Sequence, residues 1–204
     1  MTPSDKACER SNEELLALIP RPAITVYGAS SSYINSEYID AARELGRYLA
    51  DAGFAAVNGG GDTGLMGAVN DGCLEAGGCA VGVIPRFMVD RGWGHKGLTH
   101  MIVARDMHQR KEIMAGCAQA AIALPGGVGT FEELLEIITW RQLGLFNGKV
   151  VMVNTRGYYD PLLRTLRHAE DEGFMRKGPQ AERQLIWLVP TPMQAVDEVL
   201  NPIK

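Results

Sequence analysis

The chain has 204 residues, of which 46% are hydrophobic and 22% are charged, and its formal net charge is −4. This length and composition suit one globular domain that buries a single substantial core. The charge balance provides no basic excess for a nucleic-acid or anionic-membrane surface, so any site for an anion has to be local.

Apolar runs alternate with helical periods in chain order. A capping box of Ser11 and Glu14 begins a short helix, which Pro20 ends. We then expect strands at 23–27, 54–57, 79–84, 98–104, 120–124, 149–153 and 185–189. Helices are expected at 35–51, 65–76, 106–119, 130–143 and 161–172, with a last one after Thr191, and residues 85–97 are expected to be irregular.

Continuously apolar strands that alternate with helices predict an α/β fold, a doubly wound parallel sheet of about seven strands in a single domain. Residues 1–20 are expected to form an N-terminal extension with a short helix, and residues 21–204 the domain itself. Right-handed crossovers place every strand-to-helix loop at one edge of such a sheet, where ligands bind. The glycine groups at 28, 59–64 and 126–129 all follow strands, so they should meet at that edge.

The loop GGVGT at 126–130 joins an expected strand to an expected helix. Glycines let backbone N–H groups approach a ligand closely, and a helix N-terminus favours anions. Thr130 adds a hydroxyl donor. A phosphate site explains three glycines in four positions better than a tight turn without a ligand does.

The role of Glu133 has two interpretations. Thr130 and Glu133 fit the capping box S/T-x-x-E, so Glu133 can close the helix. A carboxylate beside a phosphate site is electrostatically awkward, however, which favours a catalytic role. The helical period places Phe131, Leu134, Leu135 and Ile138 on the buried stripe and Glu133 off it, and it does not decide between cap and catalyst.

The segment DMHQRK at 106–111 is unusual for a helix start. If Asp106 is the N-cap, His108, Arg110 and Lys111 fill the first turn or so, where cations oppose the helix dipole. A bound phosphate would turn this penalty into attraction, and Arg110 can bind two of its oxygens. The alternative is a solvated basic face.

The segment GGGDTG at 59–64 matches the dinucleotide fingerprint G-x-G-x-x-G. It follows the second expected strand rather than the first, and Ile84, Pro85 and Arg86 stand where the ribose-binding acid is expected. The sequence therefore supports NAD binding only weakly. Close packing of the backbone against a nucleotide ring or ribose explains the glycines as well.

The remaining candidates point to no metal site and no hydrolytic triad. His95, His100 and His108 lack metal-ligand spacing, and the four cysteines form no CxxC pair. Trp93 could line a ligand pocket, although buried or partner-facing aromatics are the commoner case. The polar N-terminus lacks the apolar core of a signal peptide, and no run of about 18 apolar residues could span a membrane. We therefore expect a cytoplasmic protein without a metal.

The motifs occur in a characteristic combination. PGGVGTFEE at 125–133 fits P-G-G-x-G-T-x-x-E, and MHQRK at 107–111, GGGDTGLMG at 59–67 and ELLEIITWRQLG at 133–144 accompany it in the usual order. In this combination the chain resembles the Lonely Guy (LOG) family of cytokinin riboside 5′-monophosphate phosphoribohydrolases, often labelled lysine decarboxylase-like. The likeness runs from about Ile24 to Val199.

The resemblance implies a Rossmann-like nucleotide-binding catalytic domain over residues 21–204 and a homodimer. It implies a hydrolase that cleaves the N-glycosidic bond of purine nucleoside 5′-monophosphates (AMP or N6-substituted AMP) without a cofactor. The products would be free base, cytokinin or adenine, and ribose 5-phosphate. By motif match Arg110 and Glu133 are catalytic. The implied substrate-binding residues are Gly28, Ser30, Met107, Lys111, Gly126, Gly127, Val128, Gly129, Thr130, Phe131, Glu132 and Thr139.

The chain departs from the family pattern at one position. Plant members have an acidic ligand-binding residue in the loop after the third strand, and that position falls on Gly92 here. Recognition of the base or ribose is therefore expected to differ. The decarboxylase label has no support, because no pyridoxal-phosphate site of the expected kind is visible and Lys111 already has a phosphate role.

Two alternatives stay open at this stage. A non-catalytic carrier of a nucleotide or phosphorylated cofactor would use the same fold and loops but release no base. A dinucleotide enzyme would bind NAD more tightly than AMP.

Overall fold

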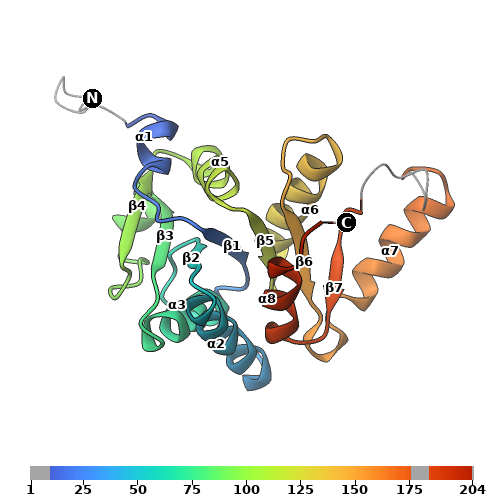
Figure 1. The fold of residues 1–204 in the computed structure, drawn as a ribbon, viewed down its shortest axis with the longest axis horizontal. Helices are drawn as coiled ribbons and strands as arrows, with labels where there is room; N and C mark the ends of the chain where they lie inside the picture. Colours follow the sequence, from blue (N-terminus) through green and yellow to red (C-terminus); the bar gives the residue numbers. More distant parts are fainter. Residues whose placement is uncertain (1–9, 176–183, 204) are drawn as a thin grey trace.

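The computed structural model describes residues 10–175 and 184–203 of the chain (Figure 1). Its centre is a seven-stranded sheet in the order β4-β3-β2-β1-β5-β6-β7, with every neighbouring pair parallel. The strands are β1 (Ala23–Tyr27), β2 (Ala55–Asn58), β3 (Ala80–Pro85), β4 (His100–Ala104), β5 (Ala120–Ala123), β6 (Lys149–Val153) and β7 (Trp187–Val189). The predicted doubly wound α/β fold is confirmed, and each strand bound lies within two residues of its expected position.

Helices cover both faces of the sheet (Figure 1). One face carries α1 (Asn12–Leu16), α5 (Met107–Cys117), α6 (Val128–Gln142) and α7 (Asp160–Asp171). The other carries α2 (Ser36–Asp51), α3 (Gly64–Glu75) and α8 (Pro192–Leu200). The two faces have separate hydrophobic clusters, because strands such as β1 and β5 are buried along their whole length and point side chains to both sides.

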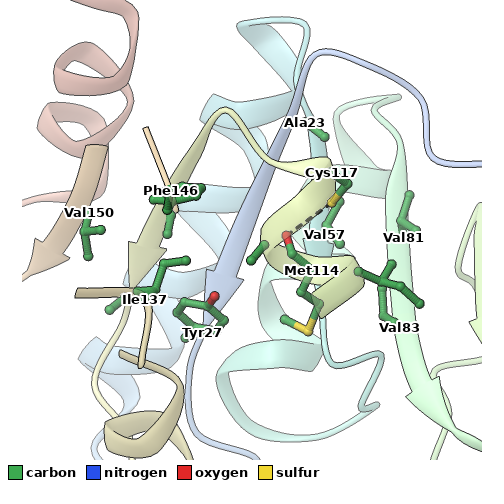
Figure 2. Close-up of a cluster of buried hydrophobic side chains, with 14 of the residues drawn as sticks. Ala23, Tyr27, Val57, Val81, Val83, Met114, Cys117, Ile137, Phe146 and Val150 are labelled. Atoms are coloured by element: carbon green, nitrogen blue, oxygen red, sulfur yellow. Dashed lines mark hydrogen bonds between the residues drawn. The ribbon is translucent and has the colours of Figure 1, made fainter. Parts of the chain in front are cut away.

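The cluster under α5 and α6 holds the two helices that carry the predicted catalytic residues (Figure 2). Met114 and Cys117 of α5 and Ile137 of α6 pack there against side chains of the strands, including Tyr27 and Val57. All five are at most 4% exposed. This packing fixes both helices on the sheet.

The N-terminal helix α1 is also part of this face. Its capping box is formed, with Ser11 accepting from the backbone N–H of Glu14. Leu15 and Ile19 are buried in the cluster beneath α5. In addition, the Gln109 side chain of α5 donates to the Asn12 side chain at 2.9 Å. Residues 1–9 of the predicted extension lie outside the described residues.

On the opposite face α2 and α3 touch backbone to backbone. A Cβ added at Gly72 would lie 1.9 Å from the carbonyl oxygen of Arg43, and one at Gly46 would lie 2.1 Å from that of Val69. Both glycines are therefore needed for the close approach of the two helices. Along the described ranges, no helix is long and apolar enough to cross a membrane.

Two expectations about local structure were wrong. Residues 85–97 were expected to be irregular, but they include a short helix, α4 (Arg86–Val89). Helix α6 begins at Val128 with Gly127 as its N-cap, two residues before the expected start. The exposed glycines at 127 and 129 obscured that start in the sequence, because glycine is a poor helix former.

Candidate functional site

The predicted site residues converge at the point where the strand order reverses, between β1 and β5. The connections from β1 and β5 run to opposite sides of the sheet, and in open α/β sheets ligands bind at such a point, outside the carboxyl ends of the strands. The loops after β1 and β5 lie side by side there, since Ala29 N–H donates to the Pro125 carbonyl at 3.2 Å. The Ala29 carbonyl in turn accepts from Leu65 N–H at 2.8 Å, which ties the start of α3 to the same edge.

Arg110 and Glu133 meet at this edge from two different helices. Nη2 of Arg110 on α5 lies 3.2 Å from Oε1 of Glu133 on α6, and the two residues are only 8% and 9% exposed. Burial raises the pKa of the Glu133 carboxyl above its ordinary value of 4.5, and the Arg110 charge opposes that rise. A buried ion pair contributes little net stability, so its placement at the ligand edge favours a chemical role.

Helix α5 presents Arg110 through a side-chain cap. Asp106 is the N-cap, as expected, and its carboxylate accepts from Gln109 N–H at 2.8 Å. Arg110 Nη1 also lies 3.6 Å from the sulfur of Met107. Its buried Nε has no hydrogen-bond partner within the described part of the chain. Such a buried donor calls for an explanation, and a ligand at this edge would supply one.

The glycines at 59–64 allow the Arg110 side chain and neighbouring backbone segments to lie against this loop. A Cβ added at Gly59 would lie 2.1 Å from Arg110 Nη2, so the guanidinium rests directly on the backbone of this loop. Gly60 has φ +73° and lies against the backbone of Gly82, and Gly64 has φ +63° and lies against the loop after β1. The segment is thus explained by packing around Arg110 and between loops, without a dinucleotide.

The glycine loop after β5 presents bare backbone to solvent. Residues 127–129 are exposed, and no side chain caps α6. Within the described ranges no acceptor is found for the N–H groups of residues 127–130. Thr130 is buried and folds back over Gly126, where an added Cβ would lie 2.1 Å from its hydroxyl oxygen. Uncapped N–H groups at the start of a helix of 15 residues suit an anion.

The capping-box interpretation of Glu133 is wrong. Since Gly127 is the N-cap, Thr130 and Glu133 both lie inside α6. The expected buried stripe is also partly wrong, because Leu135 is exposed and Glu133 is buried. The helix starts earlier than expected, and its apolar face is interrupted by the glutamate that faces Arg110.

Lys111 lies next to Arg110 and is already paired. Its ammonium contacts the carboxylates of Glu132 and Glu136, the latter at 3.0 Å. Its contact with a phosphate stays a prediction, and it would require the lysine to share its charge with the two glutamates.

The other predicted substrate-binding residues differ in their placement. Gly28 is half-buried between Leu65 and Leu124, and Ser30 is exposed in the same loop. Phe131 is half-buried on α6, and Thr139 is exposed two turns further along the helix, about 9 Å from Glu133 along its axis. The structure therefore groups the loop residues with Arg110 and Glu133 and leaves Thr139 apart.

The segment around Gly92 forms an exposed turn beside the site. Gly92 has φ +72°, which a glycine adopts without strain. The Arg91 guanidinium lies over the rings of Phe87 and Trp93, at 5.7 and 5.1 Å from their centroids. Gly94 forms a bridge with Gly61, which joins this turn to the glycine loop that holds Arg110.

Sequence reasoning missed two tyrosines that hold the β5 loop. The Tyr159 hydroxyl donates to the Leu124 carbonyl at 2.6 Å, and the Tyr158 hydroxyl donates to the Gly126 carbonyl. Both tyrosines follow β6 at the same edge of the sheet. Their position after a strand was the available signal, but their residue type did not suggest phosphate chemistry.

Comparisons with known proteins identify the family of the chain. The family model described as "Possible lysine decarboxylase" matches residues 66–199. A probable cytokinin riboside 5′-monophosphate phosphoribohydrolase of Oryza sativa subsp. japonica is 42% identical over 176 residues, covering 86% of this chain and 71% of that relative. A cytokinin riboside 5′-monophosphate phosphoribohydrolase of Rhodococcoides fascians is 44% identical over 158 residues, covering 76% and 80%.

Solved structures share the fold at lower identity. The molybdenum cofactor binding protein of Rippkaea orientalis superimposes with a TM-score of 0.67 at 20% identity, covering 88% of this chain and 96% of that one. At that identity the likeness shows the architecture alone. The family match and the relatives above 40% identity show that the chain belongs to the LOG family of cytokinin riboside 5′-monophosphate phosphoribohydrolases.

Proposed function

We propose that the protein hydrolyses the N-glycosidic bond of purine nucleoside 5′-monophosphates, AMP or N6-substituted AMP, releasing the free base and ribose 5-phosphate. The observation that carries the proposal is the buried pair of Arg110 and Glu133 beside the uncapped glycine loop. The activity for which the relatives at 42% and 44% identity are named supports the same reaction class.

The glycine loop is proposed to bind the 5′-phosphate. The N–H groups of residues 127–130 would donate to the phosphate oxygens, with the dipole of α6 adding attraction. The phosphate would then anchor the ribose next to Glu133, one turn further along α6. Binding energy from this remote group would be used to orient the reacting carbon.

Glu133 is proposed to act on the sugar. Breaking the bond between C1′ and the base leaves positive charge on C1′ and the ring oxygen, as in glycoside hydrolysis. The carboxylate would offset that charge and orient the water whose oxygen forms the new bond to C1′. The water loses a proton in this step, and the departing base gains one. Arg110 would hold Glu133 in place and keep it ionised.

The proposal is tested by incubating the protein with AMP and with N6-isopentenyl AMP, and measuring free base and ribose 5-phosphate by chromatography. Glu133→Gln should lower kcat by about 10²- to 10⁴-fold, the usual cost of losing such a group. Glu112→Gln, an exposed change on α5, is the control and should leave kcat unchanged. Saturable AMP binding without release of base would instead identify a carrier.

The phosphate is tested separately by comparing AMP with adenosine. Adenosine should be hydrolysed far more slowly, because it lacks the group that the glycine loop binds. Equal kcat/KM values on the two substrates would remove the loop from the mechanism.

We also infer that the protein is a cytoplasmic homodimer. Leu135, Leu143 and Leu145 are exposed along α6 and its C-terminal turn, which supports an apolar contact with a second copy. Thr139 lies on the same helix and would reach a nucleotide only across such a contact. Sedimentation equilibrium of the wild type and of Leu143→Glu would test this, and a monomeric wild type would contradict it.

A further inference from the structure

The loop that is proposed to bind phosphate contains a peptide with no side chain on either side. The Gly126–Gly127 peptide is flanked by two glycines, and Gly127 has no side-chain cap. Glycine populates many backbone conformations, so this peptide can flip at little steric cost. A flip would exchange the positions of its carbonyl oxygen and its N–H group. Only one orientation can present the N–H of Gly127 to an anion.

The Tyr158 hydroxyl selects one of the two orientations. It donates to the Gly126 carbonyl, which belongs to this peptide. In a trans peptide the C=O and N–H groups point in opposite directions. The bond from Tyr158 therefore directs the N–H of Gly127 away from the tyrosine. Pro125, two residues earlier, has no N–H at all, so this end of the loop has few amides to offer.

Tyr158 is itself held firmly. Its ring stacks on Phe131 of α6, with centroids 6.3 Å apart and planes at 10°. The next residue, Tyr159, donates its N–H to the Asn154 side chain at 2.8 Å. The Asn154 N–H in turn donates to the Val189 carbonyl of β7 at 2.8 Å. Through the Tyr158 hydroxyl, the glycine loop is thus fixed relative to the carboxyl ends of β6 and β7.

The second tyrosine anchors the start of the loop. The Tyr159 hydroxyl donates to the Leu124 carbonyl at 2.6 Å, and its side chain is fully buried. The two tyrosines therefore hold carbonyls on both sides of Pro125. Carbonyls that point toward an anion would repel it, and both of these are turned to hydroxyl donors instead.

We propose that Tyr158 is a positioning residue for phosphate recognition, which fixes the Gly126–Gly127 peptide so that the Gly127 N–H faces the 5′-phosphate. The proposal rests on the proposed function for its ligand, and it concerns a residue that would not touch the substrate. Tyr159 acts with it by holding the preceding carbonyl.

The test compares the full chain with Tyr158→Phe and Tyr38→Phe, using inorganic phosphate and adenosine as separate probes. Tyr38 is half-buried and meets the Tyr158 ring edge-on, so Tyr38→Phe is a matched loss of a hydroxyl nearby. Dissociation constants are measured by calorimetry, and melting temperatures confirm that the variants are folded. Tyr158→Phe should raise the Kd for phosphate about 5- to 10-fold, the effect of one hydrogen bond, and change that for adenosine less than about twofold. Tyr38→Phe should change neither.

An unchanged Kd for phosphate in Tyr158→Phe, or an equal loss for both probes, would overturn the proposal, as would a wild type that binds no phosphate. Hydrolysis of AMP by the wild type is measured independently. If no base is released but Tyr158→Phe still weakens phosphate binding selectively, the proposed function fails and the role of Tyr158 stands.

Discussion

Gly59→Ala would displace the Arg110 side chain while leaving Arg110 and Glu133, the two proposed catalytic residues, unsubstituted. The added Cβ would lie 2.1 Å from Arg110 Nη2, whereas ordinary van der Waals contact begins at 3.4 Å. The guanidinium must therefore retreat by about 1.3 Å from the position in which it contacts Glu133. A misplacement of about 1 Å in an active site can cost about 10²-fold in rate. We expect kcat to fall by about that factor, which corresponds to about 2.7 kcal/mol in the barrier.

The same change should have little effect on stability. The clash involves the far end of a flexible side chain, and φ at Gly59 is not in the left-handed region. Gly61→Ala is the matched control, because its Cβ would meet only the flexible side chain of Met66, at 3.0 Å, and not Arg110. Both variants would be assayed for release of base from AMP and for melting temperature.

If Arg110 acts from its observed position, Gly59→Ala is folded with low kcat, and Gly61→Ala is folded with nearly normal kcat. If Gly59→Ala retains full activity, Arg110 has no need of the position seen here, and its role in the reaction is refuted. If both variants lose activity equally, the loss reflects the loop as a whole rather than the arginine.

Three further outcomes follow from the structure. Burial raises the pKa of Glu133, so kcat/KM should fall as pH falls through a value above 4.5. Arg110→Met removes the charge that lowers this pKa, so it should move the acid limb of the pH–rate profile to higher pH. An unmoved acid limb would contradict the assignment of Glu133. Gly126→Ala places a Cβ 2.1 Å from the Thr130 hydroxyl, so KM for AMP should rise about 10-fold or more while kinetics on adenosine change little. Gly72→Ala places a Cβ 1.9 Å from a carbonyl oxygen of α2, and urea denaturation should show a loss of about 1–3 kcal/mol with no selective effect on KM.

Much of the fold was predictable because it follows from strong local signals. Apolar runs bounded by glycine or proline gave the strands, and the alternation with helices gave the parallel sheet. The rule that strand-to-helix loops share one edge also predicted that the loops after β1, β2 and β5 would meet. Arg110 and Glu133 are close for this reason, although 22 residues separate them in the chain.

The remaining details depend on contacts between distant residues. The start of α6 was predicted too late because Thr130 resembles an N-cap, whereas its side chain is used to cover Gly126. The purpose of Gly59 could not be read from GGGDTG, because its neighbour is an arginine 51 positions later. Tyr158 lies 32 positions after the residue whose carbonyl it binds, so no local pattern links them.

The first helix, α1, supports α5, the helix that carries Arg110. Leu15 and Ile19 are buried in the hydrophobic cluster that also contains Met114 and Cys117 of α5, and the Asn12 side chain accepts a hydrogen bond from Gln109, the residue just before Arg110. A shortened protein that starts at Pro22 would therefore lose apolar packing against α5 and one side-chain hydrogen bond to that helix. We expect this shortened protein to form its sheet but to have low activity. Trimming residues 1–21 for crystallisation or fusion design would therefore weaken the support of the helix that carries Arg110.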